Sequence, residues 1–65
     1  MQAYEVVSRR VERTGITVAE LARRTAIDHM ALRSSLHGKR ALKADELVSL
    51  AAELKLEMSD FYDAA

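Results

Sequence analysis

Residues 17–37 read TVAELARRTAIDHMALRSSLH, and this stretch decides the fold of the chain. Thr17 and Glu20 have the spacing of a capping box, in which a hydroxyl and a carboxylate bond the free amides at the start of a helix, here residues 18–25. Asp28 can cap a second helix over residues 29–37. The pattern therefore predicts two short helices separated by a three-residue turn.

Helical spacing continues on both sides of this stretch. The chain contains no Pro and two Gly, so it has few residues that break helices. A helix is predicted over about residues 2–13, and another follows a loop over residues 38–43. The buried stripe of that later helix would consist of Leu47, Leu50, Ala51 and Leu54. Ser59 is predicted to cap a last turn, with Leu56 and Met58 as core residues.

The length and composition bound the class of protein. Sixty-five residues are enough for one small domain, which we expect to span residues 1–65 as an all-α bundle of five short helices. The absence of Cys excludes disulfides and Cys-based zinc sites. Apolar runs reach only two or three residues, so neither a membrane span nor a signal peptide is predicted. We expect a soluble, cytoplasmic protein.

The charge of the chain is strongly asymmetric although its total is zero. Residues 9–43 carry nine basic and three acidic side chains, a net charge of +6. Residues 44–65 carry one basic and six acidic side chains, a net charge of −5, and Glu5 supplies the remaining −1. This division predicts one side that faces an anionic partner and one side that faces away.

The helix predicted over residues 29–37 has a polar face of unusual content. At 100° per residue, its inward half holds Leu36, Leu32, Ser35 and Ala31. A single arc of about 140° holds His29, Arg33, His37, Met30 and Ser34. Every amphipathic helix has some outward face, so one alternative is that this face is only solvated.

Metal binding and catalysis are poorly supported by the same residues. His29 and His37 are eight residues apart, about 12 Å along a helix, which is too far for one tetrahedral ion. Ser34 and His37 could touch, but no carboxylate would orient them and a convex helix offers no cleft. We therefore expect no enzyme, no metal and no cofactor. The remaining functional reading is contact with base edges in a DNA major groove.

The order of these features resembles a known family. Residues 15–62, GITVAELARRTAIDHMALRSSLHGKRALKADELVSLAAELKLEMSDFY, are similar to the Cro and phage-repressor type helix-turn-helix domain, the XRE family. The matching positions are the small Ala22 where the two helices pack, Ile27 after the turn, Leu32 inside the second helix, the Gly38-Lys39-Arg40 loop and the E-L-x-x-L-A-x-x-L pattern of residues 46–54. The resemblance implies a lambda-repressor-like bundle with its helix-turn-helix at about 17–37.

The resemblance also implies which residues meet DNA. The base-contacting positions of the family correspond to His29, Met30, Arg33 and Ser34. Arg33 is the best candidate for guanine, whereas Met30 either packs on a thymine methyl group or fills the core. Contacts to the DNA backbone are implied for Thr17, His37, Lys39, Arg40 and Lys43. Arg9, Arg10 and Arg13 either add phosphate contacts or are solvated.

Three positions depart from the pattern of the family. Ala26 stands where Gly usually forms the turn, so a positive φ there would cost roughly 1 kcal/mol. Val18 stands where a Gln often clamps a phosphate, which leaves that contact to Thr17 or to backbone amides. Lys55 stands where Gly often ends the fourth helix.

The function implied by the resemblance is sequence-specific regulation of transcription, as in Cro or a small phage or bacterial repressor. The partner would be double-stranded DNA. The resemblance implies a palindromic operator that a homodimer binds. Phe61, Tyr62 and exposed residues of the fourth helix are candidates for self-association, although Phe61 and Tyr62 could equally close the core. Two alternatives stay open: an antitoxin-type regulator that also binds a toxin, and a protein-interaction module that has lost DNA binding.

Overall fold

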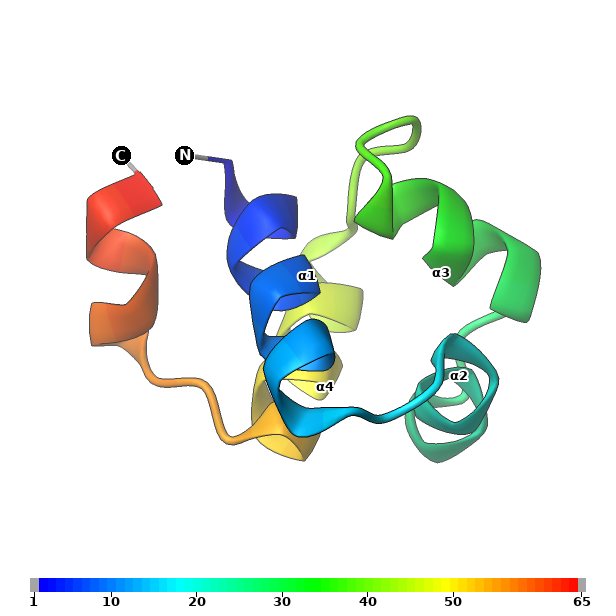
Figure 1. Ribbon diagram of the computed structural model, residues 1–65. Helices are drawn as coiled ribbons and strands as arrows, with labels where there is room; N and C mark the ends of the chain where they lie inside the picture. The colour runs from blue at the N-terminus through cyan, green and yellow to red at the C-terminus, as the bar shows by residue number, and fades with distance from the viewer. Residues whose placement is uncertain (1, 65) are drawn as a thin grey trace.

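Four α-helices and one 3-10 helix follow one another in the computed structural model, which describes residues 2–64 (Figure 1). They are α1 (Ala3–Thr14), α2 (Val18–Thr25), α3 (His29–Leu36), α4 (Ala44–Leu54) and η1 (Met58–Ala64). No strand occurs within this range, and the predicted all-α fold class is confirmed. None of these helices combines the length and the apolar character needed to cross a bilayer.

The start of α2 forms half of the predicted capping box. The Oγ1 of Thr17 accepts a hydrogen bond from the amide of Glu20 at 3.1 Å. The carboxylate of Glu20 does not return to the Thr17 amide; it accepts hydrogen bonds from Arg23 and Arg24 on the next turn. Two guanidinium groups within reach are stronger partners for a carboxylate than one exposed backbone amide.

The two ends of α3 are set by the residues that the sequence indicated. The Oδ2 of Asp28 accepts a hydrogen bond from the amide of Ala31 at 3.0 Å. After α3 the chain reverses through Gly38, whose φ is 76°. The ring of Tyr4 in α1 lies against this glycine, and a Cβ at position 38 would lie 2.7 Å from the Tyr4 Cζ. Gly38 therefore serves both the left-handed turn and the close approach of α1.

The core lies where α1, α2, α3 and α4 meet. Helix α2 packs against α3 and α4, while α1 packs against α3, α4 and η1. The buried cluster consists of Val7, Val11, Leu21, Ala22, Leu32, Leu50 and Leu54. Leu21, Leu32 and Leu50 are completely inaccessible to solvent. One leucine from each of three helices thus forms the centre that holds α2 and α3 onto α4.

Among residues 2–64, two residues other than glycine have a positive φ. Ala26 in the turn between α2 and α3 has φ 59° and ψ 25°, and Lys55 at the end of α4 has φ 58° and ψ 41°. Gly adopts this left-handed conformation at little cost, whereas a residue with a Cβ is strained in it. The sequence left open whether Ala26 would adopt a positive φ; the structure shows that it does, so its Cβ carries the strain.

Replacement of Ala26 by Gly should stabilise the protein. Ala26→Gly removes the steric penalty of the left-handed conformation, and we expect the free energy of unfolding to rise by about 0.5 to 1 kcal/mol. Urea denaturation followed by circular dichroism measures this change. Ala52→Gly, at an exposed position within α4, is the matched control and should lose a similar amount. A loss in both variants would contradict the strain assigned to Ala26.

The C-terminal segment differs from the prediction in two respects. Met58 was expected in the core, but its side chain is 75% exposed, because Leu56 and Phe61 fill the available space against the core. Ser59 was expected to cap the last turn, but η1 already begins at Met58. A carboxylate oxygen of Asp60 instead accepts a hydrogen bond from the amide of Glu57 at 2.6 Å. The charged acceptor is the stronger cap.

Candidate nucleic-acid interface

Helix α3 presents the predicted polar arc to solvent. His29, Met30, Arg33 and His37 are exposed and Ser34 is half-buried, whereas Leu32 and Ser35 are buried. The side chain of Met30 is 68% exposed, so its alternative role as a core residue is wrong. In Figure 1, α3 lies on the side of the molecule opposite η1. With Leu32 and Ser35 buried and the polar arc exposed, α3 is available to enter a groove in a partner.

Unpaired positive charge surrounds α3. Of the nine basic side chains in residues 9–43, those with ion pairs are Arg10, Arg23, Arg24 and Arg40. Within the part of the chain that the structure describes, no ion pair involves Arg9, Arg13, Arg33, Lys39 or Lys43. Arg33, Lys39 and Lys43 belong to α3 or to the loop that follows it. The positive charge available to an anion is therefore concentrated there.

Arg40 has a different environment from the other predicted backbone contacts. Its Nη1 donates to the Ser35 Oγ at 2.9 Å and to the Glu46 Oε1 at 3.0 Å. Its Nη2 donates to the Glu46 Oε2 at 3.0 Å. The Glu46 Oε1 also accepts a hydrogen bond from the amide of Lys43 at 3.0 Å. The guanidinium thus belongs to an internal network that joins α3 to the start of α4.

Helix α1 also holds the C-terminal end of α3. The Ser8 hydroxyl donates to the Leu36 carbonyl oxygen at 2.8 Å, and Tyr4 contacts Gly38 two residues further on. Sequence reasoning missed Ser8, Tyr4 and Glu46 as residues that position the site. Only Glu46 carried a usable signal. It lies three positions after Lys43, the residue before α4, and an acidic residue at this spacing often caps the start of a helix.

The arginines of α1 have separate roles. The Arg10 Nη1 donates to the Leu54 carbonyl oxygen at 2.9 Å, and its Nη2 lies 3.7 Å from a carboxylate oxygen of Asp60. Arg10 therefore ties α1 to the end of α4 and to η1, which neither of its two predicted alternatives included. Arg9 and Arg13 are exposed.

Among the described residues, no group of three His, Asp or Glu side chains is arranged to hold a metal ion.

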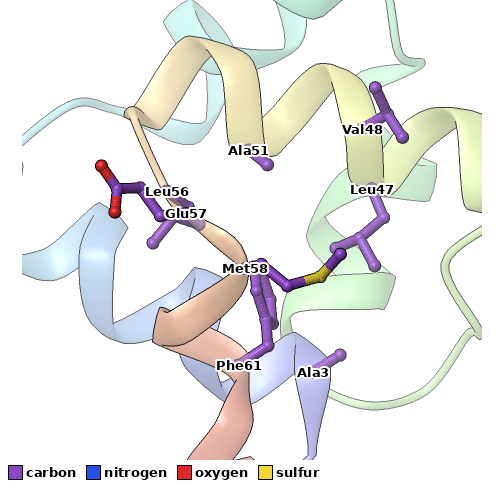
Figure 2. A pocket seen from close by; sticks show the side chains of 8 residues that line it. All are labelled: Ala3, Leu47, Val48, Ala51, Leu56, Glu57, Met58 and Phe61. Carbon is purple, nitrogen blue, oxygen red and sulfur yellow. The ribbon is translucent and has the colours of Figure 1, made fainter.

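An apolar groove lies away from α3, between the start of α1, α4 and η1 (Figure 2). It has a volume of about 490 Å³ and is lined by Ala3, Leu47, Val48, Ala51, Leu56, Glu57, Met58 and Phe61. Val48 and Met58 are 69% and 75% exposed at its margins. Tyr62, also in η1, is 68% exposed, so it does not close the core, whereas Phe61 packs against it.

Two carboxylates should make the stability depend on pH. Hydrogen bonds from Arg40 lower the pKa of Glu46, and those from Arg23 and then Arg24 lower the pKa of Glu20. A carboxylate whose pKa is lower in the folded than in the unfolded state stabilises the fold. This contribution is fully present at pH values above the pKa of the unfolded state, about 4.3, and it is lost as the pH falls from there toward the pKa of the folded state. We expect the melting temperature to drop between about pH 5 and pH 3.

The control for this pH dependence is the pair of isosteric amides. A variant with Glu20→Gln and Glu46→Gln lacks both carboxylates, so its melting temperature should fall less over the same interval than that of the unchanged protein. Thermal unfolding followed by circular dichroism at a series of pH values measures the difference. Parallel curves for the two proteins would contradict the assignment.

Comparison with known proteins adds no relative. No family model, curated protein or solved structure matches this chain. The candidate interface therefore stands on the residues and geometry described above.

Proposed function

We propose that this protein is a sequence-specific DNA-binding regulator of transcription that places α3 in the major groove. One observation carries the proposal: α3 exposes a polar arc that includes Arg33, and the loop after it carries Lys39 and Lys43, none of which has an ion pair among residues 2–64. A major groove admits an α-helix, and phosphates flank it on both sides. The surface thus combines a shape and a charge that suit duplex DNA.

Each polar group of this surface has a separate task in the proposal. The Arg33 guanidinium donates two hydrogen bonds to a guanine, and Met30 packs on a thymine methyl group. His29 and Ser34 contact neighbouring base edges. The hydroxyl of Thr17 accepts the amide of Glu20, which leaves its own proton free for a phosphate oxygen. His37, Lys39 and Lys43 bind phosphates and set the register without reading the sequence.

The proposal includes a homodimer on a palindromic operator. One α3 contacts few base pairs, and two copies on half-sites about 34 Å apart would read twice as many. The apolar groove with Val48 and Met58 at its margins, together with Tyr62, supports a self-association surface. Sedimentation of the protein with its operator duplex tests this part. A complex of one chain per duplex would refute the dimer and leave the single-site reading intact.

Selection of bound duplexes from a random DNA pool tests the function itself. We expect enrichment of one motif, present as an inverted repeat if the protein binds as a dimer. The affinity for the selected duplex should fall steeply with salt, with a slope of about −0.9 per phosphate contact. A pool that shows no enrichment would refute the proposal.

A second candidate function is a protein-interaction module. Four of the nine basic side chains in residues 9–43 are neutralised internally, and the apolar groove is open. Both features are compatible with a protein partner, and neither of them requires DNA. Binding to random genomic DNA at low salt separates the two functions, because phosphate contacts give measurable binding without any sequence match.

A further inference from the structure

Helix α3 is anchored unevenly along its length. Its C-terminal half carries the bond from Ser8 to Leu36, the bond from Arg40 to Ser35 and the contact of Tyr4 with Gly38. Its N-terminal half has exposed side chains at positions 29 and 30 and the cap at Asp28. Leu32, buried in the middle of α3, anchors the helix by packing, whereas the side-chain bonds that can fix its rotation gather at its C-terminal end.

Arg40 supplies a polar connection between α3 and α4 in addition to the shared apolar core. Helix α3 packs mainly against α1 and α2, and the hydrogen bonds found across residues 2–64 include none made directly between α3 and α4. The Arg40 guanidinium bridges them, because it bonds both the Ser35 hydroxyl and the Glu46 carboxylate. The Ser35 side chain is completely buried, so its hydroxyl has no access to water as a substitute partner.

We propose that Arg40 is a positioning residue that sets the rotation of α3 about its axis and thereby the sequence discrimination of Arg33. This inference rests on the proposed function, and it differs from the phosphate contact that the sequence implied for Arg40. A guanidinium paired with a carboxylate through two parallel hydrogen bonds has its charge largely neutralised. Glu46 would also repel a phosphate brought close to this pair.

The geometry explains why rotation matters. Ser35 lies two residues after Arg33 on the same helix, so a rotation that displaces one displaces the other. At the helix surface, about 5 Å from the axis, a rotation of about 20° moves a side chain by roughly 2 Å. Recognition sites must hold their groups within about 0.5 Å of the productive position. A bond from a buried hydroxyl to a fixed guanidinium restricts that rotation.

The test measures sequence discrimination, which is the affinity for the selected duplex divided by the affinity for a duplex altered at the base pair read by Arg33. Two variants that break the network are compared with two control variants. Arg40→Met and Glu46→Gln should each lower this ratio by about tenfold, within the range of one Arg–guanine contact, and leave the salt slope unchanged. The double variant should be no worse than either single variant, because one network is broken once.

Two controls separate positioning from other effects. Arg24→Met removes another interhelical ion pair, from α2 to Glu53 in α4, and should keep the ratio unchanged. Lys39→Met removes an unpaired phosphate contact and should weaken binding to both duplexes equally, with a salt slope smaller by about one. If Arg40→Met behaves like Lys39→Met while Glu46→Gln does not, Arg40 binds phosphate and the proposal is wrong. It is also wrong if Arg40→Met lowers only the melting temperature.

Amide hydrogen exchange in the absence of DNA makes the positioning testable even if no duplex is selected. Arg40→Met and Glu46→Gln should speed the exchange of α3 amides more than of α2 amides. Ser35→Ala removes only the α3 end of the network, retains the ion pair, and replaces Arg40→Met if that variant does not fold. Equal acceleration in α2 and α3 overturns the positioning role. A pool without enrichment, by contrast, would overturn the proposed function alone.

Discussion

Substitution of Arg33 by Ala should lower the affinity for the selected DNA by about 1 to 3 kcal/mol, which is about 5-fold to 150-fold. The structure gives two reasons to expect an effect of this size. Arg33 is exposed on the outward arc of α3, and it makes no ion pair with any described residue. Its guanidinium therefore has no ion pair among the described residues to break before it bonds a guanine.

The loss should be specific to sequence. Arg33→Ala should also relax the preference at a single base pair, because the bidentate contact that distinguishes guanine is absent. Fluorescence anisotropy with duplexes varied at each position measures both quantities. Lys39→Ala is the matched comparison: it also removes one unpaired cation but should weaken all duplexes alike. Retention of both affinity and preference in Arg33→Ala would show that α3 does not read the groove.

Substitution of Leu32 by Ala should produce the largest loss of stability along α3. Leu32 is completely buried among the leucines of α2 and α4, and removal of such a side chain typically costs about 2 to 5 kcal/mol. A domain of this size has a total stability of only about 3 to 10 kcal/mol. We therefore expect Leu32→Ala to be partly or wholly unfolded at 37 °C.

The matched control for Leu32→Ala is Met30→Ala in the same helix. Met30 is 68% exposed, so its truncation should change the free energy of unfolding by less than about 0.5 kcal/mol. Urea denaturation of the two variants separates a packing effect from an effect on helix propensity. Similar losses in both would mean that the rotation of α3 differs from the one described.

The local features of the fold were predictable because they depend on residues within one or two helical turns. Thr17, Asp28 and Gly38 mark helix ends through bonds to amides or carbonyls a few residues away, and all three hold those positions. The inward and outward faces of α3 followed from helical periodicity. Ala26 and Lys55 were local conflicts, and the left-handed conformation of Ala26 shows that packing of α2 against α3 outweighs a penalty of about 1 kcal/mol.

Partners distant in sequence were not predictable. Arg40 matched a loop pattern that implied a phosphate contact, yet its donors bond Ser35 and Glu46. Arg10 was considered only as a surface cation, and its partner Asp60 is fifty positions away. A long flexible side chain has many carboxylates within reach of its rotamers, and only the placement of the helices selects one.

Helices α1 to α4, the caps of α2 and α3 at Thr17 and Asp28, and the face of α3 that meets solvent could be read from the sequence, because they follow from periodicity and from hydrogen bonds between near neighbours. The tertiary structure alone decided which cations remain unpaired, where Met58 lies and how α3 is held against α4. Those outcomes depend on contacts between segments such as Tyr4 with Gly38 and Arg40 with Glu46. Such contacts form only when the buried leucines bring the helices together.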